Sequence, residues 1–181
     1  MREYATQMEA ARKGILTEAM KAAAASEQIE PARLMQLMAE GKVIIPCNRL
    51  HTCIAPSAIG SMLKTKINVN LGVSRDWKDM DMELEKVRDA VAMGAESIMD
   101  LSSYGDTRTF RRTLTQECPA MIGTVPIYDA VVYYHKPLKE ITSEEWIRIV
   151  EMHAQDGVDF MTIHVGINRQ TARRFKEAKR L

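Results

Sequence analysis

The sequence predicts an α/β fold: a parallel (β/α) barrel of the TIM type that is incomplete, with about five strands, and preceded by helices. Two observations support this. Short apolar segments alternate with longer segments of helical periodicity, and no short hairpin turn joins consecutive strands. A glycine, a small apolar residue and an acid also precede two strands in the same order, at Gly94-Ala-Glu96 and Gly157-Val-Asp159. Parallel strands need crossover connections, and right-handed crossovers curl a sheet toward a barrel.

Residues 1–41 are expected to form an N-terminal helical segment. Residues 6–25 have helical spacing and an alanine-rich centre, and alanine is the best helix former. A second helix is expected to begin at Pro31, a residue suited to the first helical turn, and to end at Gly41. Residues 42–181 then form the partial barrel.

The strands of the partial barrel are expected near residues 43–46, 66–71, 97–101, 120–127 and 158–164. A long loop is expected between the first two. A closed (β/α)8 barrel typically needs about 250 residues, so this chain would leave an open sheet edge. Such an edge is a liability unless a partner or the N-terminal helices cover it, which favours a homodimer or another association through the open edges.

Four further helices are expected over residues 79–93, 107–117, 143–155 and 168–180. Gly94 ends the first of them, and Asp106 can cap the second. The segment Thr142-Ser-Glu-Glu145 is a capping box that opens the third. These signals place a helix between most pairs of strands.

Composition excludes several classes of function. The chain has 181 residues, of which 46% are hydrophobic and 27% charged, as in soluble globular domains. A net charge of +1 gives no basic surface for nucleic acid. No apolar run approaches the ~20 residues of a membrane span, and the N-terminus lacks the apolar core of a signal peptide. We therefore expect a cytoplasmic protein.

The cysteines and three of the histidines favour structural roles. Cys47, Cys53 and Cys118 have no metal-binding spacing and are expected to be buried or partly buried thiols. Three histidines are also interpreted as non-functional, namely His51, His135 and His153. His51 falls in the long loop, and His153 is expected on the exposed part of a helix.

Four predicted strands carry chemically useful side chains at or near their C-terminal ends: Asn70, Met99, Tyr128 and His164. In (β/α) barrels the active site lies at this end of the strands. Taken singly, each residue has a plainer interpretation, as a turn former, a core methionine, a buried ring or a core histidine. Their shared position favours a binding site.

Several motifs follow one another over nearly the whole chain. They include Ile45-Pro-x-Asn48, Thr65-Lys-Ile-Asn-Val-Asn70-Leu-Gly72, Met99-Asp-Leu-Ser102, Gly123-Thr-Val-Pro-Ile-Tyr128 and Gly157-Val-Asp-Phe-Met-Thr-Ile-His164. As a set they resemble the ThiC-like family of radical S-adenosylmethionine enzymes. The resemblance implies a (β/α)8 barrel and a lyase of thiamine biosynthesis. That lyase rearranges 5-aminoimidazole ribotide to 4-amino-2-methyl-5-hydroxymethylpyrimidine phosphate, using S-adenosylmethionine, a 4Fe–4S cluster and zinc.

The resemblance also implies that Asn70, Met99, Tyr128 and His164 contact the substrate, while it leaves the catalytic residues of this chain unknown. An amide, a phenol and an imidazole offer donors and acceptors that can orient a polar ribotide. Fixed orientation matters where a radical must abstract one particular hydrogen. We expect the four side chains to converge on one concave surface, because neighbouring strands lie about 4.8 Å apart.

Other family motifs do not occur in these 181 residues. They are a Ser-Arg-Gly turn, two zinc-binding histidines and the Cys-x-x-Cys-x4-Cys motif of the iron–sulfur cluster. No metal ligand is therefore expected in this chain. The chain is expected to be the N-terminal part of such an enzyme, a truncated form of it or a remnant. Alone it is expected to be inactive, unable to cleave S-adenosylmethionine and able to bind the ribotide only weakly.

Two alternatives stay open at this point. The segments 102–108 and 167–173, together with Asp129, are similar to a paralogue that makes 5-hydroxybenzimidazole, the lower ligand of cobamides, from the same ribotide. The sequence does not separate the two products. The other alternative is a non-catalytic half-barrel that binds a ribotide or a partner chain.

Overall fold

A parallel sheet of four short strands, in the order β3-β4-β5-β6, forms the centre of the fold in the computed structural model, which describes residues 3–178. The strands are β3 (Asn68–Leu71), β4 (Ser97–Asp100), β5 (Met121–Thr124) and β6 (Phe160–Met161). Their register places Asn70 beside Met99, Met99 beside Gly123, and Gly123 beside Phe160. The predicted α/β class and the parallel pairing of these four strands are confirmed.

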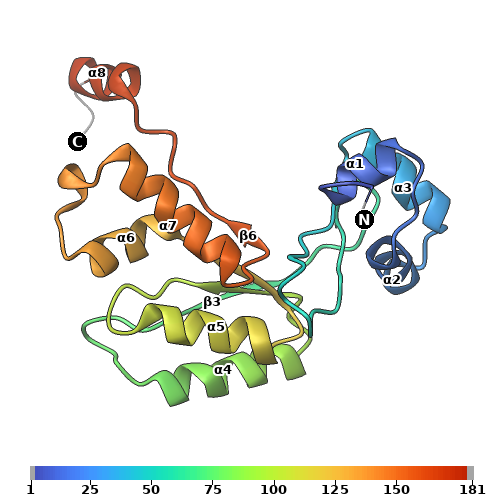
Figure 1. Ribbon diagram of the computed structural model, residues 1–181, viewed down its shortest axis with the longest axis horizontal. Coiled ribbons are helices and arrows are strands. Elements are labelled where there is room, and N and C mark those ends of the chain that lie inside the picture. Colours follow the sequence, from blue (N-terminus) through green and yellow to red (C-terminus); the bar gives the residue numbers. More distant parts are fainter. Residues whose placement is uncertain (1–2, 179–181) are drawn as a thin grey trace.

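Helices connect the strands and cover one face of the sheet (Figure 1). They are α4 (Met80–Ala92), α5 (Thr107–Glu117), α6 (Pro126–Tyr134) and α7 (Ser143–Gln155), with a short 3-10 helix, η1 (Leu138–Glu140), before α7. The predicted caps are present, since Asp106 accepts from the Thr109 amide and Thr142 forms its capping box with Glu145. Ile98 and Ile122 of the sheet pack against Phe110 of α5 in one apolar core.

The opposite face of the sheet carries different side chains. Asn68 and Asn70 are exposed there, and Met99 is partly buried beside Asn70. Gly123 lies on the same row, where the ring of Phe160 occupies the space that a Cβ would need, and the nearest ring atom is 2.3 Å from that position. This face is therefore polar at β3 and closed by an aromatic ring at β5. Whether the sheet curves into a partial barrel stays a prediction.

The N-terminal residues form a helical lobe beside the sheet, drawn in blue in Figure 1. It consists of α1 (Gln7–Arg12), α2 (Glu18–Glu27), α3 (Pro31–Ala39) and a two-stranded antiparallel ribbon of β1 (Val43–Ile44) and β2 (Ile59–Gly60). The single helix expected over residues 6–25 is wrong, because the chain turns at Gly14, whose φ is 71°.

The expectation that residues 43–46 join the parallel sheet is also wrong. Val43 and Ile45 are buried with Leu34, Leu37 and Met38 in the core of the helical lobe. β1 therefore pairs with β2, inside the segment that was expected to be a loop. The apolar run predicts a buried strand, but nothing local in the sequence distinguishes burial against helices from burial in a parallel sheet.

The strand expected over residues 120–127 ends early. β5 stops at Thr124, and Pro126 begins α6 at its first position, where proline has a suitable φ and needs no hydrogen-bond donor. Tyr128 therefore lies in the first turn of a helix and not at a strand end. β6 is likewise shorter than the expected 158–164, so His164 follows the strand instead of ending it.

Hydrogen bonds fasten the segment after β1 to the sheet. Asp159 accepts from the backbone amide of Asn48 at 2.7 Å, and its other oxygen lies 2.7 Å from Nδ1 of His51. The second nitrogen of His51 lies 2.7 Å from the carbonyl oxygen of Cys118. Burial lowers the pKa of His51, but Asp159 and that carbonyl outweigh it and raise the pKa above its usual value. His51 is thus a buried histidine whose two ring nitrogens both have hydrogen-bond partners.

The last described element is α8 (Arg169–Glu177), within the helix expected over 168–180, of which residues 179–180 lie outside the described residues. It stands apart from the sheet and has no buried side chain (Figure 1). None of the helices within residues 3–178 combines the length and apolar character that crossing a lipid bilayer requires.

Candidate functional site

Tyr128 and His164 lie side by side. Their ring centroids are 6.0 Å apart and the rings are tilted by 42°. Tyr128 comes from the first turn of α6 and is 41% exposed, while His164 comes from the exposed segment after β6. The structure therefore brings together two predicted site residues that follow neighbouring parallel strands.

Both rings line a broad hollow of about 1310 Å³, which we call the strand-end hollow. The segment after β4 contributes Ser103 and Tyr104 to its lining, and the segment after β3 contributes Arg75. Much of the remaining lining comes from α6 and the residues that follow it. Aromatic, apolar and cationic groups thus surround a space that is large enough for a small polar ligand.

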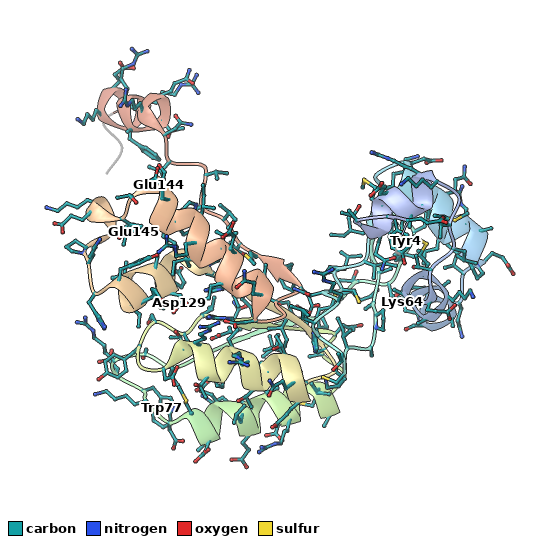
Figure 2. All side chains as sticks on the ribbon, viewed as in Figure 1. Tyr4, Lys64, Trp77, Asp129, Glu144 and Glu145 are labelled. Carbon is teal, nitrogen blue, oxygen red and sulfur yellow. The ribbon has the colours of Figure 1, made fainter. Side chains whose placement is uncertain are left out.

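Asn70 and Met99 form a second pair, by direct register between β3 and β4. Asn70 lines a smaller hollow of about 390 Å³ at the start of α4, together with Gly72, Trp77 and Lys86. Trp77 marks this place in Figure 2. The four predicted residues therefore occur as two pairs, of which Tyr128 and His164 line one hollow and Asn70 lines another, while Met99 lies beside Asn70 in the sheet. Their convergence on one surface stays a prediction.

A buried charge network supports the helix that carries Tyr128. It consists of Thr107, Arg111, Asp129, His153 and Asp156. Arg111 is 1% exposed and donates to Asp129 at 3.2 Å and to Asp156 at 2.9 Å. Figure 2 shows Asp129 between α5 and the pair α6–α7. Since Asp129 directly follows Tyr128, this network fixes the first turn of α6.

His153 is buried in this network, so its expected exposure is wrong. Burial and the nearby charge of Arg111 outweigh the attraction of Asp129 and lower the pKa of His153. A neutral ring donates from Nε2 to Asp129 at 2.9 Å and accepts at Nδ1 from the hydroxyl of Thr124 at 2.8 Å. The spacing of Ile149 and His153 on one helix face could have indicated this burial.

Asp129 is ionised within the network. Burial raises its pKa, but hydrogen bonds from His153 and Thr107 and the charge of Arg111 outweigh burial and lower it. Arg111, Asp129 and Asp156 were not predicted as a site, because each resembles an ordinary surface charge in the sequence. Their contact depends on how α5, α6 and α7 pack.

Asp100 is a second buried carboxylate, on the helix-covered face of β4. Burial raises its pKa from 3.8 to about 6, although one oxygen accepts from the Ser102 amide at 2.8 Å. A folded-state pKa above the unfolded one means that stability falls as pH rises from about 4 to 6 and stays reduced above that range. Ionised Asp100 thus destabilises the fold at neutral pH.

Replacing Asp100 with asparagine is expected to raise the free energy of unfolding at pH 7 by about 1 kcal/mol. Removing the buried charge gains roughly 3 kcal/mol, and the new amide group loses part of this because its donors lack partners. Urea denaturation between pH 4 and 8 tests the prediction. The stability of Asp100→Asn should no longer fall between pH 4 and 6, and an unchanged pH profile would show that Asp100 does not titrate there.

The described residues do not fit an iron–sulfur cluster or a zinc ion. Cys47 is partly buried, Cys118 is buried, and Cys53 is exposed, contrary to the expectation for Cys53. Burial raises the pKa of Cys53 and of Cys118, which keeps both thiols protonated. Within residues 3–178 no group of three histidine, cysteine or acidic side chains is placed to hold a metal ion.

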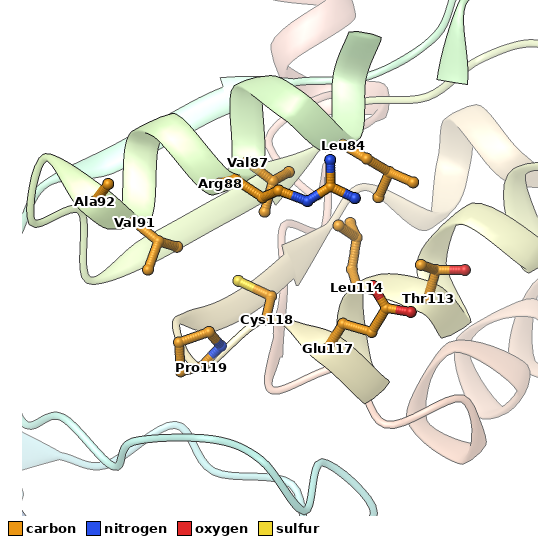
Figure 3. A pocket seen from close by; sticks show the side chains of 10 residues that line it. All are labelled: Leu84, Val87, Arg88, Val91, Ala92, Thr113, Leu114, Glu117, Cys118 and Pro119. Atoms are coloured by element: carbon orange, nitrogen blue, oxygen red, sulfur yellow. The ribbon is translucent and has the colours of Figure 1, made fainter. Parts of the chain in front are cut away.

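One further pocket lies away from these residues. It has a volume of about 300 Å³ and is lined by apolar side chains between α4 and α5, including Val87, Val91 and Leu114 (Figure 3). Arg88 and Glu117 flank it. None of the predicted site residues lines this pocket, and it opens on the helical side of the sheet.

Comparison with known proteins identifies the family. The model of the radical SAM ThiC family matches residues 6–181. The phosphomethylpyrimidine synthase of Pelotomaculum thermopropionicum is 60% identical over 178 residues, which are 98% of this chain and 41% of that protein. Those of Clostridium kluyveri and Clostridium novyi are 56% and 57% identical over the same share of each chain. The chain thus spans about two fifths of the length of these relatives. The chain belongs to the radical SAM ThiC family.

Proposed function

We propose that this chain is the substrate-facing N-terminal part of a phosphomethylpyrimidine synthase of thiamine biosynthesis. Such an enzyme rearranges 5-aminoimidazole ribotide to 4-amino-2-methyl-5-hydroxymethylpyrimidine phosphate. The observation that carries the proposal is the pairing of Tyr128 with His164 at the strand-end hollow. The names of the relatives favour the thiamine pyrimidine over 5-hydroxybenzimidazole as the product.

In this proposal the chain binds and orients the ribotide. The phenol of Tyr128 and the imidazole of His164 each offer a donor or an acceptor to the polar ligand, and the amide of Asn70 offers both. Met99, beside Asn70, supplies an apolar surface against which a planar ring can rest. S-adenosylmethionine and the cluster would supply the radical in the whole enzyme, so the role of these four side chains is to hold one substrate geometry.

The edges of the sheet support a proposal about partners. β3 and β6 each have one neighbour among the described strands. An uncovered edge strand can pair with another chain. We propose that a second copy of the chain, or the remaining part of a longer enzyme, covers one of these edges.

The binding proposal predicts that Tyr128→Phe and His164→Gln each weaken binding of 5-aminoimidazole ribotide by up to about tenfold, the effect of losing one hydrogen bond. Titration of the ¹⁵N-labelled chain, followed by nuclear magnetic resonance, measures the affinity. Tyr133→Phe is the matched control, because Tyr133 lies on α6 and packs edge-on against Tyr134 without lining the hollow.

The control variant should bind like the wild-type chain. If the wild-type chain shows no shifts at millimolar ligand, the ribotide proposal fails for this chain. If Tyr133→Phe weakens binding as much as Tyr128→Phe does, the ligand does not sit at the strand-end hollow. A chain that binds the ribotide but never gains activity when joined to the remaining family motifs would favour the non-catalytic alternative.

A further inference from the structure

Three side chains on the polar face of the sheet form a chain of hydrogen bonds, which we call the amide relay. The hydroxyl of Ser97 donates to Oδ1 of Asn68 at 2.8 Å. Nδ2 of Asn68 then donates to Oδ1 of Asn70, also at 2.8 Å. The relay connects β4 to β3, because Asn68 and Ser97 are register partners in adjacent strands.

The relay determines which end of the Asn70 amide is free. An asparagine side chain has one carbonyl oxygen that accepts and one NH2 group that donates. The oxygen of Asn70 is engaged by Asn68, while no described residue accepts a hydrogen bond from its NH2 group. Asn70 is exposed. The end of the amide that has no partner among the described residues, and that a ligand meets unoccupied, is therefore the donor.

The base of the relay is buried. Ser97 is 5% exposed at the start of β4, where β3 and β5 flank it on both sides. Asn68 and Asn70 alternate with Val69, which packs into the apolar core on the other face. Strand geometry thus holds all three side chains in line.

We propose that Ser97 and Asn68 are positioning residues that fix Asn70 as a hydrogen-bond donor toward the ligand. The ligand must then place an acceptor at this point, such as an unprotonated ring nitrogen or a ribose or phosphate oxygen, and an N–H group there is rejected. The identity of the ligand rests on the proposed function, whereas the orientation of Asn70 rests only on the three side chains.

The orientation is tested first in the free chain, by hydrogen exchange of the side-chain amides followed by nuclear magnetic resonance. One N–H of Asn68 should exchange more slowly than both N–H groups of Asn70. Ser97→Ala should remove this difference by freeing Asn68. Slow exchange at Asn70 with fast exchange at Asn68 would mean that the relay runs in the opposite direction, which overturns the proposal.

The consequence for binding is tested with Asn70→Asp and Asn70→Ala, using 5-aminoimidazole ribotide and its neutral riboside. Aspartate keeps the acceptor and loses the donor, so both variants should bind either probe about tenfold more weakly than the wild-type chain does. The riboside removes charge repulsion between an introduced carboxylate and the phosphate. Near-wild-type binding of the riboside by Asn70→Asp would show that Asn70 acts as an acceptor and would overturn the proposal.

Asn68→Ala tests positioning itself, because it leaves Asn70 in place and frees its amide to rotate. Binding should weaken severalfold, by less than in Asn70→Ala. Unchanged affinity would show that Asn68 does not position Asn70. Asn168→Asp, which keeps its oxygen as the cap of α8, is the control for added charge and should change nothing. If the wild-type chain binds neither probe, the proposed function fails, while the exchange measurement still decides the direction of the relay.

Discussion

Replacing Arg111 with alanine is expected to lower the free energy of unfolding by about 3–5 kcal/mol, because it leaves two buried carboxylates without their partner. Arg111 is 1% exposed and bonds to Asp129 and to Asp156. Asp156 keeps the partly exposed Arg108, and Asp129 keeps His153 and Thr107. These remaining partners do not replace a buried positive charge. Urea denaturation followed by circular dichroism measures the loss.

Arg112→Ala is the matched control. Arg112 is the next residue of α5, is exposed, and its side chain makes no ion pair with a described residue. Its replacement should change stability by less than about 0.5 kcal/mol. Combining Arg111→Met with Asp129→Asn and Asp156→Asn should recover part of the loss, since all three buried charges then disappear together. Equal losses in Arg111→Ala and Arg112→Ala would contradict a buried network.

The network also connects stability to the candidate site. Asp129 and Tyr128 are adjacent in the first turn of α6, so a mobile Asp129 displaces the phenol from its place beside His164. Arg111→Ala should therefore weaken ribotide binding even under conditions where the chain stays folded. Sequence reasoning proposed Tyr128 and His164 as site residues but did not predict the residues that hold them.

Some helices and strands could be predicted from the sequence and others could not, for physical reasons. Local signals located the helices well where a cap fixes the first turn, as at Asp106 and Thr142. The repeat that begins at Gly94 and Gly157 likewise preceded β4 and β6. These features depend on a few adjacent residues, whose backbone preferences do not change with tertiary packing.

Features that depend on distant partners were not predictable in the same way. The strand at Val43 was recognised, but its neighbour β2 lies within a segment that has no strand signal of its own. The pairing of Arg111 with Asp156 joins α5 to the end of α7. Pro126 marks α6 in retrospect, yet an apolar segment before it favoured a continued strand. Charge pairing and burial therefore had to come from the structure.

Replacing Gly72 with alanine is expected to destabilise the chain by about 2–5 kcal/mol, from a left-handed backbone and from overpacking together. Gly72 has a φ of 141°, and a Cβ there would lie 2.6 Å from the amide nitrogen of Ser102 and 2.9 Å from the carbonyl carbon of Leu101. These are backbone atoms, so they cannot move aside as a flexible side chain can. The ends of β3 and β4 would have to separate.

Gly94→Ala separates the two causes, because Gly94 also has a positive φ, of 92°, but nothing lies within 4 Å of its Cβ position. The free energy of unfolding of Gly94→Ala should fall only by the cost of the unfavourable backbone conformation, about 1–2 kcal/mol. The difference in stability between the two variants then measures the close approach of β3 to the segment after β4.

Separation of these strand ends also shifts Asn70, which lies two residues before Gly72. Gly72→Ala should therefore weaken ribotide binding, while Gly94→Ala should not. Equal losses of stability in both variants would mean that the backbone around Ser102 yields, and that the polar face of the sheet is less rigid than the amide relay requires.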